Sequence, residues 1–114
     1  MAPVGVCRLC MVDVTGKAVI SCKTPAAEGM AVRTETEDIR RVRRTAMLLL
    51  LKNHHTDCTT CTRNNNCQLQ RLAQFVGVTA EDLARLRPPG PKHEPDRSNP
   101  FFDRDLDKCV VCGI

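Results

Sequence analysis

Four candidate metal ligands lie within fourteen residues in the middle of this sequence, in the stretch "HHTDCTTCTRNNNC" (54–67). They follow the spacing His54-x3-Cys58-x2-Cys61-x5-Cys67, and His55 is an adjacent spare imidazole. One imidazole and three thiolates make up the ligand set of either a 4Fe-4S cluster or a tetrahedral zinc ion. The spacing suits both, although a typical zinc finger places about a dozen residues or more between its ligand pairs.

Two further groups of cysteines flank this central group. Cys7-x2-Cys10 is followed by Cys22, and Cys109-x2-Cys112 lies near the end of the sequence. Three thiolates are one fewer than a 2Fe-2S cluster requires, and the last group has only two. Because both groups lack ligands, we expect this sequence to be the middle part of a longer polypeptide.

The composition favours metal ligation over disulfides. The 114 residues include eight cysteines, no Trp, no Tyr and three Phe, so few side chains can bury a large apolar area. Metals or disulfides usually supplement such a core. The N-terminus lacks the pattern of a secretory signal, and the longest apolar run, "AMLLLL" (46–51), is too short to span a bilayer. We therefore expect a cytoplasmic protein, whose thiols stay reduced and available to metals.

The net charge of +4 is concentrated in "RRVRR" (40–44). A basic run of this kind can contact nucleic acid, but no aromatic residue that could stack on bases is interleaved with it. A solvated helix face is the favoured interpretation, with no nucleic-acid partner. The alternative function is a zinc-stabilised binding module that uses this basic face on an acidic partner.

Hydrophobic patterning predicts a β-hairpin followed by a strand and a helix. Residues 11–20 alternate around a turn at 15–17, and residues 29–36 indicate a further strand. A helix is predicted from Glu37 to Lys52, capped by Thr34 in a capping box with Glu37, or by Thr36. Its apolar side is predicted to comprise Ile39, Val42, Ala46, Leu49 and Leu50.

The second half of the chain is predicted to be helical around the cysteine loop. Three asparagines (64–66) indicate a turn with left-handed backbone, since Asn tolerates that conformation. A second helix is predicted from Gln68 to a stop at Gly77, and a third over 79–87 with Thr79 and Asp82 as its start signal. "RPPGP" (87–91) ends helix formation, and residues 92–106 are predicted to be extended over the surface.

The three groups, in this order, resemble an iron–sulfur region shared by three kinds of oxidoreductase subunit. These are the large cluster-bearing subunit of NADH:quinone oxidoreductase, the α subunit of cytosolic NAD-dependent formate dehydrogenase, and the iron-only hydrogenases. The stretch "GVCRLCMVDVTGKAVISCKTPAAEGMAVRTET" (5–36) is similar to their N-terminal 2Fe-2S domain. "NHHTDCTTCTRNNNCQLQRLA" (53–73) is similar to their 4Fe-4S motif, and "SNPFFDRDLDKCVVCG" (98–113) to the start of their two-cluster ferredoxin domain. This last stretch favours the formate dehydrogenase α type.

The resemblance implies a ligand set for each group. It assigns Cys7, Cys10 and Cys22 to a 2Fe-2S cluster, His54, Cys58, Cys61 and Cys67 to a 4Fe-4S cluster, and Cys109 and Cys112 to a second 4Fe-4S cluster. His55 stands where the family often has proline, so it is not expected to be a ligand. The family's first 2Fe-2S cysteine lies before Met1, and its catalytic domain is not represented in this sequence. Asp57 and Arg63 flank the cysteines and are candidates for tuning the central cluster.

The expected fold class is α+β, in four parts. Residues 1–36 are expected to form a partial β-grasp, 2Fe-2S ferredoxin-like segment, and 37–87 a helical module with the His-ligated 4Fe-4S cluster. Residues 88–107 are an extended linker, and 108–114 begin a bacterial-type ferredoxin domain. The implied function is electron relay without a catalytic residue, between an NAD- or flavin-linked partner and a catalytic metal site. The implied partners are flavin/NAD-binding and catalytic subunits of an oxidoreductase complex, with no membrane span.

Overall fold

The alternating stretch near the N-terminus forms the predicted β-hairpin. The computed structural model describes residues 3–52, 54, 57–86 and 93–109, and in it β1 (Met11–Val14) pairs antiparallel with β2 (Lys17–Ile20). Thr15 and Gly16 connect the strands with φ angles of 52° and 85°. Positive φ at both central residues is the requirement of a turn whose twist matches that of the flanking strands. The Gly16 N–H also donates to the Asp13 carboxylate at 2.8 Å, which holds the turn closed.

The third strand is shorter than predicted. Only Val32–Arg33 forms β3, which pairs antiparallel with β1 and gives the sheet order β2-β1-β3. Before it, Gly29 has a φ of 74° and the Met30 N–H bonds the Ala27 carbonyl, so the chain is still turning at residue 30. Asp13 lies opposite Arg33, and their side chains form a cross-strand ion pair of 3.1 Å.

The long helix α1 (Glu37–Leu51) starts at Thr36 and not at Thr34, which corrects one of the two predicted caps. Thr36 is extended, with φ −73° and ψ 155°, and its hydroxyl accepts a hydrogen bond from the Ile39 N–H at 3.3 Å. Only the residue directly before the first helical one can satisfy the free N–H groups of the first turn in this way. Glu37 and Asp38 add negative charge where the helix dipole favours it.

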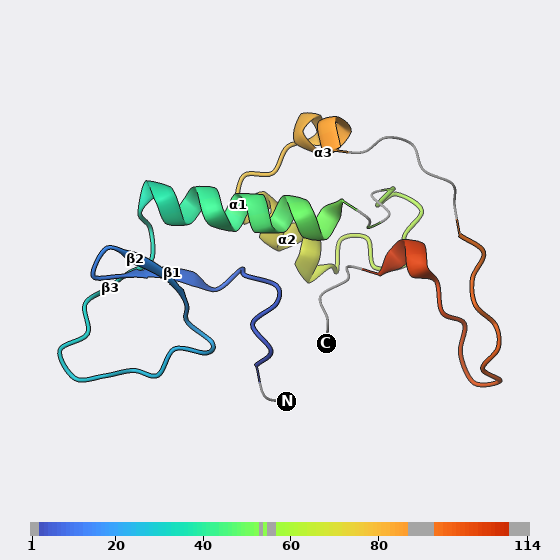
Figure 1. The fold of residues 1–114 in the computed structure, drawn as a ribbon. Coiled ribbons are helices and arrows are strands. Elements are labelled where there is room, and N and C mark those ends of the chain that lie inside the picture. The colour runs from blue at the N-terminus through green and yellow to red at the C-terminus, as the bar shows by residue number, and fades with distance from the viewer. Residues whose placement is uncertain (1–2, 53, 55–56, 87–92, 110–114) are drawn as a thin grey trace.

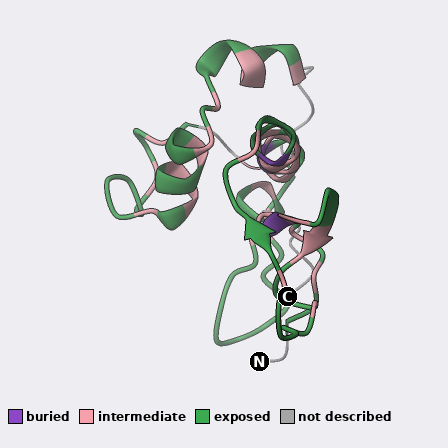
Figure 2. Ribbon diagram, turned by 90° about the vertical axis from the view of Figure 1, so that its left-hand side faces the viewer, coloured by how far each residue is buried: buried purple, intermediate pink, exposed green. Residues whose placement is uncertain are grey.

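The predicted apolar side of α1 is partly wrong. The buried residues are Ile39, Met47 and Leu51, whereas Leu49 is 64% exposed. Figure 2 shows buried positions on α1 and on the sheet beneath it. The buried stripe follows a spacing of four residues, which drifts by about 40° per step around an α-helix. It winds because α1 packs against β1, α2 and α3, which lie on different sides of it (Figure 1).

Two short helices follow the cysteine loop, as predicted. Helix α2 (Gln68–Phe75) ends before Gly77, whose φ of 74° reverses the chain, and α3 is Ala80–Leu86. The start signal of α3 forms a reciprocal capping box. The Asp82 N–H donates to the Thr79 hydroxyl at 3.2 Å, and the Thr79 N–H donates to the Asp82 carboxylate at 2.8 Å.

The stretch after α3 doubles back where an extended course was predicted. The N–H groups of Asp96 and Arg104 each donate to the other's carbonyl at 2.8 Å, which makes an isolated antiparallel bridge. One turn of 3-10 helix, η1 (Leu106–Lys108), follows. Residues 93–108 therefore form a closed loop, drawn in orange and red in Figure 1. Local hydrogen bonds formed by polar side chains produce this shape, and hydrophobic periodicity gives no signal of it.

The apolar core is small. Among the described residues only Met11, Val12, Ile39, Met47 and Leu51 are buried hydrophobic side chains. All three phenylalanines are exposed, namely Phe75, Phe101 and Phe102. The radius of gyration is 16.7 Å, against about 13 Å for a compact chain of this length. The described residues thus do not form the single large core that usually supplies most of the free energy of folding.

Met47 should be the most sensitive core position. Its side chain is 0% exposed, so Met47→Ala leaves a cavity and should lower the free energy of unfolding by about 2–5 kcal/mol. Leu49→Ala is the matched control on the same helix and should change it by about 0.5 kcal/mol or less, because Leu49 is largely exposed. Urea unfolding of both variants checks this. Equal losses for the two variants would contradict the winding stripe.

Candidate metal centre

The central cysteine loop consists of consecutive tight turns between α1 and α2. The Cys61 N–H donates to the Cys58 carbonyl at 3.3 Å, and the Asn64 N–H donates to the Cys61 carbonyl at 3.0 Å. Asn65 has a φ of 62°, which confirms the predicted left-handed turn. Cys67 is the N-cap residue of α2. A helix N-terminus favours negative charge, which suits a thiolate at this position.

The four ligands predicted for the central group come together. They line one pocket of about 120 Å³. This is several times the volume of about 15 Å³ that one water molecule needs. Its lining residues are Leu51, His54, Cys58, Cys61, Arg63, Asn64, Cys67, Leu69, Gln70, Ala73 and Leu83. A site for a single metal ion would bring at least three His, Cys, Asp or Glu side chains close together. No such group is found within the described ranges. A shared pocket of this size fits a cluster of several atoms better than one ion.

His54 is held by a contact that its sequence neighbourhood does not indicate. Its Nδ1 lies 3.0 Å from the backbone carbonyl oxygen of Lys108. A carbonyl oxygen can only accept a hydrogen bond, so Nδ1 carries the proton and Nε2 is the ring nitrogen that has a lone pair in the neutral imidazole. Histidine ligands commonly have their second nitrogen engaged in this manner. His55, the spare imidazole, lies outside the described residues.

The two charged residues beside the central cysteines have different roles. The Arg63 N–H donates to the Cys61 sulfur at 3.5 Å, and Arg63 also lines the pocket. Hydrogen bonds to ligand sulfurs are one of the means by which proteins set cluster potentials. The Asp57 carboxylate accepts hydrogen bonds from the hydroxyls of Thr59 at 2.5 Å and Thr60 at 3.0 Å. Asp57 therefore organises the turn in which Cys58 lies.

The hairpin register brings the first cysteine group together. Met11 pairs with Ile20, and the Ser21 N–H bonds the Cys10 carbonyl at 3.1 Å, so Cys10 and Cys22 are neighbours at the end of the hairpin. Partial burial is the largest influence on the pKa of Cys10 and acts to raise it, but hydrogen bonds from Cys22 and Ser21 outweigh it and lower the pKa. The pKa of Cys22 is raised, first because its thiol donates to Cys10.

Cys7 lies close enough to Cys22 for its charge to contribute to the raised pKa of Cys22. The structure thus brings Cys10 and Cys22 into contact and places Cys7 within electrostatic range of Cys22. In the third group, Cys109 is exposed and directly follows η1, and Cys112 lies outside the described residues. The thiols of the other six described cysteines are free, namely Cys7, Cys10, Cys22, Cys58, Cys61 and Cys67.

The basic run on α1 is paired with carboxylates. Glu35 binds Arg40 at 3.1 Å and Arg43 at 3.2 Å, and Arg41 pairs with Asp38. Arg43 is only 13% exposed, and its Nε donates to the Met11 carbonyl at 3.0 Å, so it joins α1 to β1. The prediction that these arginines lie mainly on solvated flanks is therefore wrong for Arg43.

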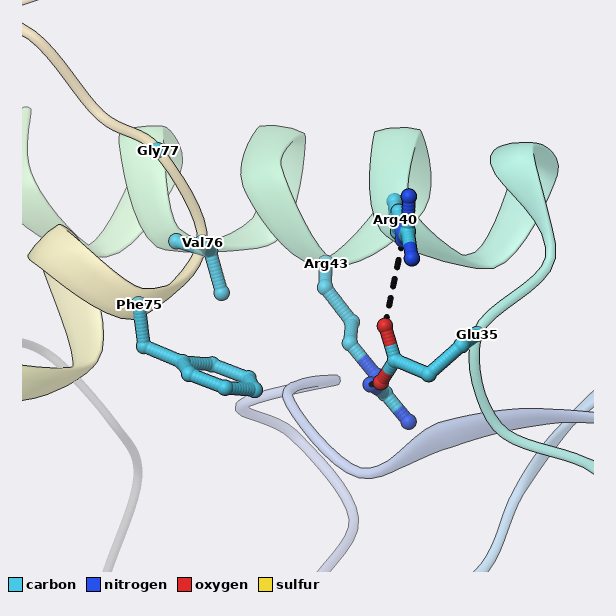
Figure 3. A pocket seen from close by; sticks show the side chains of 6 residues that line it. All are labelled: Glu35, Arg40, Arg43, Phe75, Val76 and Gly77. Carbon is cyan, nitrogen blue, oxygen red and sulfur yellow. Dashed lines mark hydrogen bonds and ion pairs between the residues drawn. The ribbon is translucent and has the colours of Figure 1, made fainter.

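Arg44 joins α1 to the start of α3. Its Nε donates to the Gly77 carbonyl at 3.1 Å, and it pairs with Asp82 at 2.6 Å. A larger hollow of about 340 Å³ lies beside this run, and Figure 3 shows its lining side chains: Glu35, Arg40, Arg43, Phe75, Val76 and Gly77. This hollow is separate from the cysteine pocket, and none of these lining residues is a typical ligand of soft metals.

Comparisons with known proteins match both halves of the described structure. Residues 1–37 match the family model described as a 2Fe-2S iron–sulfur cluster binding domain. Residues 43–82 match the NADH-ubiquinone oxidoreductase-G iron–sulfur binding region. The second range contains every lining residue of the cysteine pocket except Leu83. Over these two ranges the chain is similar to the iron–sulfur regions of such oxidoreductase subunits.

Individual relatives agree with the family models. The iron–sulfur region is 35% identical over 116 residues to the Bacillus subtilis protein named "Putative formate dehydrogenase YrhE", covering 97% of this chain and 11% of that protein. It is 34% identical over 110 residues to the NADP-reducing hydrogenase subunit HndD of Solidesulfovibrio fructosivorans, covering 93% and 18%. It is 29% identical over 119 residues to a subunit of the NADH-quinone oxidoreductase of Escherichia coli, covering 98% and 13%.

A crystal structure of an NAD+-reducing [NiFe]-hydrogenase in the H2-reduced state has the same fold. The TM-score is 0.83 at 34% identity, and the match covers 99% of this chain and 47% of that chain. The predictions of an α+β fold and of 2Fe-2S and 4Fe-4S cofactors are thereby confirmed. The region is an iron–sulfur segment of electron-transfer type, and it spans less than a fifth of the curated relatives named above.

Sequence reasoning found the candidate ligands but missed what surrounds them. Leu83 of α3 lines the central pocket from outside the cysteine loop, and Lys108 provides the carbonyl that binds His54. No spacing rule could have indicated either contact, because both depend on how distant segments pack. None of the helices that the structure describes is long and apolar enough to cross a membrane.

Acid should weaken the attachment of α3 to α1 through Asp82. Its pKa is lowered, first by the hydrogen bond from the Thr79 N–H and also by the Arg44 charge. A carboxyl whose pKa is lowered in the folded state stabilises the fold above its unfolded pKa, and this contribution is lost as the pH falls through the folded value. Relative to wild type, Asp82→Asn should be less stable at pH 7, and this difference should shrink below about pH 4.

Chemical unfolding between neutral and acidic pH measures this effect. Asp103→Asn is the matched control, because Asp103 also pairs with an arginine, Arg97, but is 64% exposed, and exposed pairs contribute little. If the difference between Asp82→Asn and wild type does not change with pH, the carboxylate is not the group that holds α3.

Proposed function

We propose that this chain is an iron–sulfur relay segment that passes single electrons within a larger oxidoreductase, with the formate dehydrogenase type favoured. One observation carries the proposal, namely that one imidazole and three thiols line the same pocket. We assign its 4Fe-4S cluster to His54, Cys58, Cys61 and Cys67. When bound, such a cluster accepts and releases one electron at a time.

The residues of the central pocket would hold the cluster and shield it from water. Three thiolates and a neutral imidazole place one negative charge fewer at the site than four thiolates would. The Arg63 N–H donates to the Cys61 sulfur and disperses some of its charge. Leu51, Leu69 and Leu83 form apolar walls, and the low local dielectric strengthens every polar interaction inside the pocket.

The other two cysteine groups are proposed as neighbouring positions of the relay. Cys7, Cys10 and Cys22 would supply three ligands of a 2Fe-2S cluster in a partial β-grasp segment over 1–36. Cys109 and Cys112 would begin a second 4Fe-4S cluster in a ferredoxin domain starting at 108, after a linker over 88–107. The helical module over 37–87 would lie between them.

The proposed partners are an NAD- or flavin-linked subunit on one side and a catalytic metal site on the other, in a cytoplasmic complex. Names of relatives support this, since they include subunits of an NADP-reducing hydrogenase and of an NADH-quinone oxidoreductase. Both family models that match the chain concern cluster binding, and the chain's own residues are assigned no catalytic step.

Metal analysis of the anaerobically purified chain tests the proposal. About four iron and four sulfide should depend on the central group, and Cys61→Ala should remove them. Thr62→Ala is the matched control in the same loop and should retain them, because Thr62 is exposed and is not a lining residue of the pocket. Iron in excess of four that is lost in Cys10→Ala would place a second cluster at the first group. About one zinc without sulfide would contradict the relay and support the zinc-stabilised module.

Replacing the imidazole should lower the potential of the central cluster. His54→Cys offers a fourth thiolate, which adds one negative charge and makes reduction less favourable. Redox titration followed by electron paramagnetic resonance should give a midpoint potential below that of wild type at equal iron content. An unchanged midpoint with unchanged iron would mean that residue 54 does not bind the cluster.

A further inference from the structure

The hydrogen bond between His54 and Lys108 joins two segments that are 54 residues apart in the sequence. His54 follows the end of α1, and Lys108 ends η1 in the last described part of the chain. A neutral imidazole that lacks such a partner can carry its proton on either ring nitrogen. The position of one backbone carbonyl therefore decides which nitrogen of the neutral His54 ring carries the proton.

The carbonyl of Lys108 is itself placed by the turn in which it lies. The Asp105 carboxylate accepts from the Asp107 N–H at 3.1 Å and pairs with the Lys108 ammonium at 2.9 Å. The N–H groups of Lys108 and Cys109 donate to the carbonyls of Asp105 and Leu106 at 3.3 and 3.1 Å. These bonds fix the orientation of the 108–109 peptide unit. The nearby charge of Cys61 also contributes to raising the pKa of Lys108, after the larger effect of Asp105, which agrees with the closeness of the two segments.

A second set of hydrogen bonds, between His93 and Asp107, joins the two ends of the loop of residues 93–108. The backbone N–H and the ring Nδ1 of His93 both bind the Asp107 carboxylate, at 3.1 and 2.7 Å. The Asp96–Arg104 bridge closes the loop again three residues further along. Figure 1 shows the result, in which the loop leaves and returns so that η1 lies beside the central cysteine loop. The shape of the loop is thus set by hydrogen bonds within it that do not involve His54.

We propose that the loop of residues 93–108 is the positioning element of His54, and that Asp105 and Asp107 are its positioning residues. They act through the Lys108 carbonyl, which holds the imidazole in the Nδ1–H form, in which Nε2 is the unprotonated ring nitrogen. The value of this arrangement for the cluster rests on the proposed function. The hydrogen bond itself belongs to the protein chain, so it can be tested without a cluster.

The first test uses the reduced, metal-free chain labelled with 15N, at a temperature at which circular dichroism shows the same helix content as in the iron-loaded chain. Long-range 1H–15N correlation spectra of His54 should report the Nδ1–H tautomer in wild type, and Asp107→Ala should shift the population toward Nε2–H. Asp105→Ala should shift it in the same direction. Asp103→Ala is the matched control on the same loop, because Asp103 pairs with Arg97 at 3.5 Å near the loop tip and is 64% exposed. It should leave the tautomer unchanged.

The second test uses the iron-loaded chain. Wild type should show strong coupling between a histidine 14N and the reduced cluster in electron–nuclear double resonance, and Asp107→Ala should change this coupling and shift the midpoint potential. Asp107→Glu, which keeps the carboxylate, should restore part of both. Circular dichroism confirms that each variant retains its helices.

The outcomes separate the two proposals. An Nε2–H tautomer in wild type, or a tautomer that is unaffected by Asp107→Ala and Asp105→Ala, would overturn the positioning role whatever the metal content. Iron and sulfide without any histidine 14N coupling in wild type would overturn the proposed ligation by His54, even if the loop controls the tautomer in the metal-free chain.

Discussion

Burial of one winding edge of α1 is the interaction on which the rest of this structure depends. Ile39, Met47 and Leu51 are three of the five buried hydrophobic residues in the described chain, and they follow the four-residue rows of the helix. Two adjacent arginines, Arg43 and Arg44, connect the same helix to different neighbouring elements. Arg43 bonds the backbone of β1, and Arg44 bonds the turn before α3 and the cap of that helix. The sheet and the helices α2 and α3 are thereby all attached to α1.

The described residues bury few apolar side chains. The chain has no Trp or Tyr, and its three phenylalanines lie on the surface. Small proteins with such cores commonly gain stability from metal ligation, because ligands that are brought together only in the folded state couple metal binding to folding. The cysteine groups therefore have two physical effects. They provide sites for clusters, and they supply connections that the small core does not.

The position of the central pocket follows from these attachments. α1 ends at Leu51, which is buried and also lines the pocket, so the helix delivers His54 to the cysteine loop. α2 begins at Cys67 and α3 is turned back by Gly77, which lets Leu83 close the pocket from another side. Each wall comes from a different element, and the arrangement of these elements is set by the packing around α1.

The sequence by itself determined the features that depend on a few neighbouring residues. The hairpin follows from alternation around Thr15 and Gly16, the turn at Asn65 from a residue that tolerates positive φ, and the start of α3 from Thr79 and Asp82. The cysteine spacings and the resemblance identified the iron–sulfur region, because ligand spacing within one loop is local chemistry. These features could be predicted since their causes lie within a few positions of one another.

Only the tertiary structure decided which residues of α1 face inward, and which distant groups complete the site. Met47 is buried and Leu49 is not because the partners of α1 wrap around it, and a periodicity of the helix alone cannot show where they lie. The Lys108 carbonyl reaches His54 through a loop shaped by hydrogen bonds of Asp96, Asp105 and Asp107. A backbone carbonyl has no sequence signature, so its role depends entirely on where folding places it.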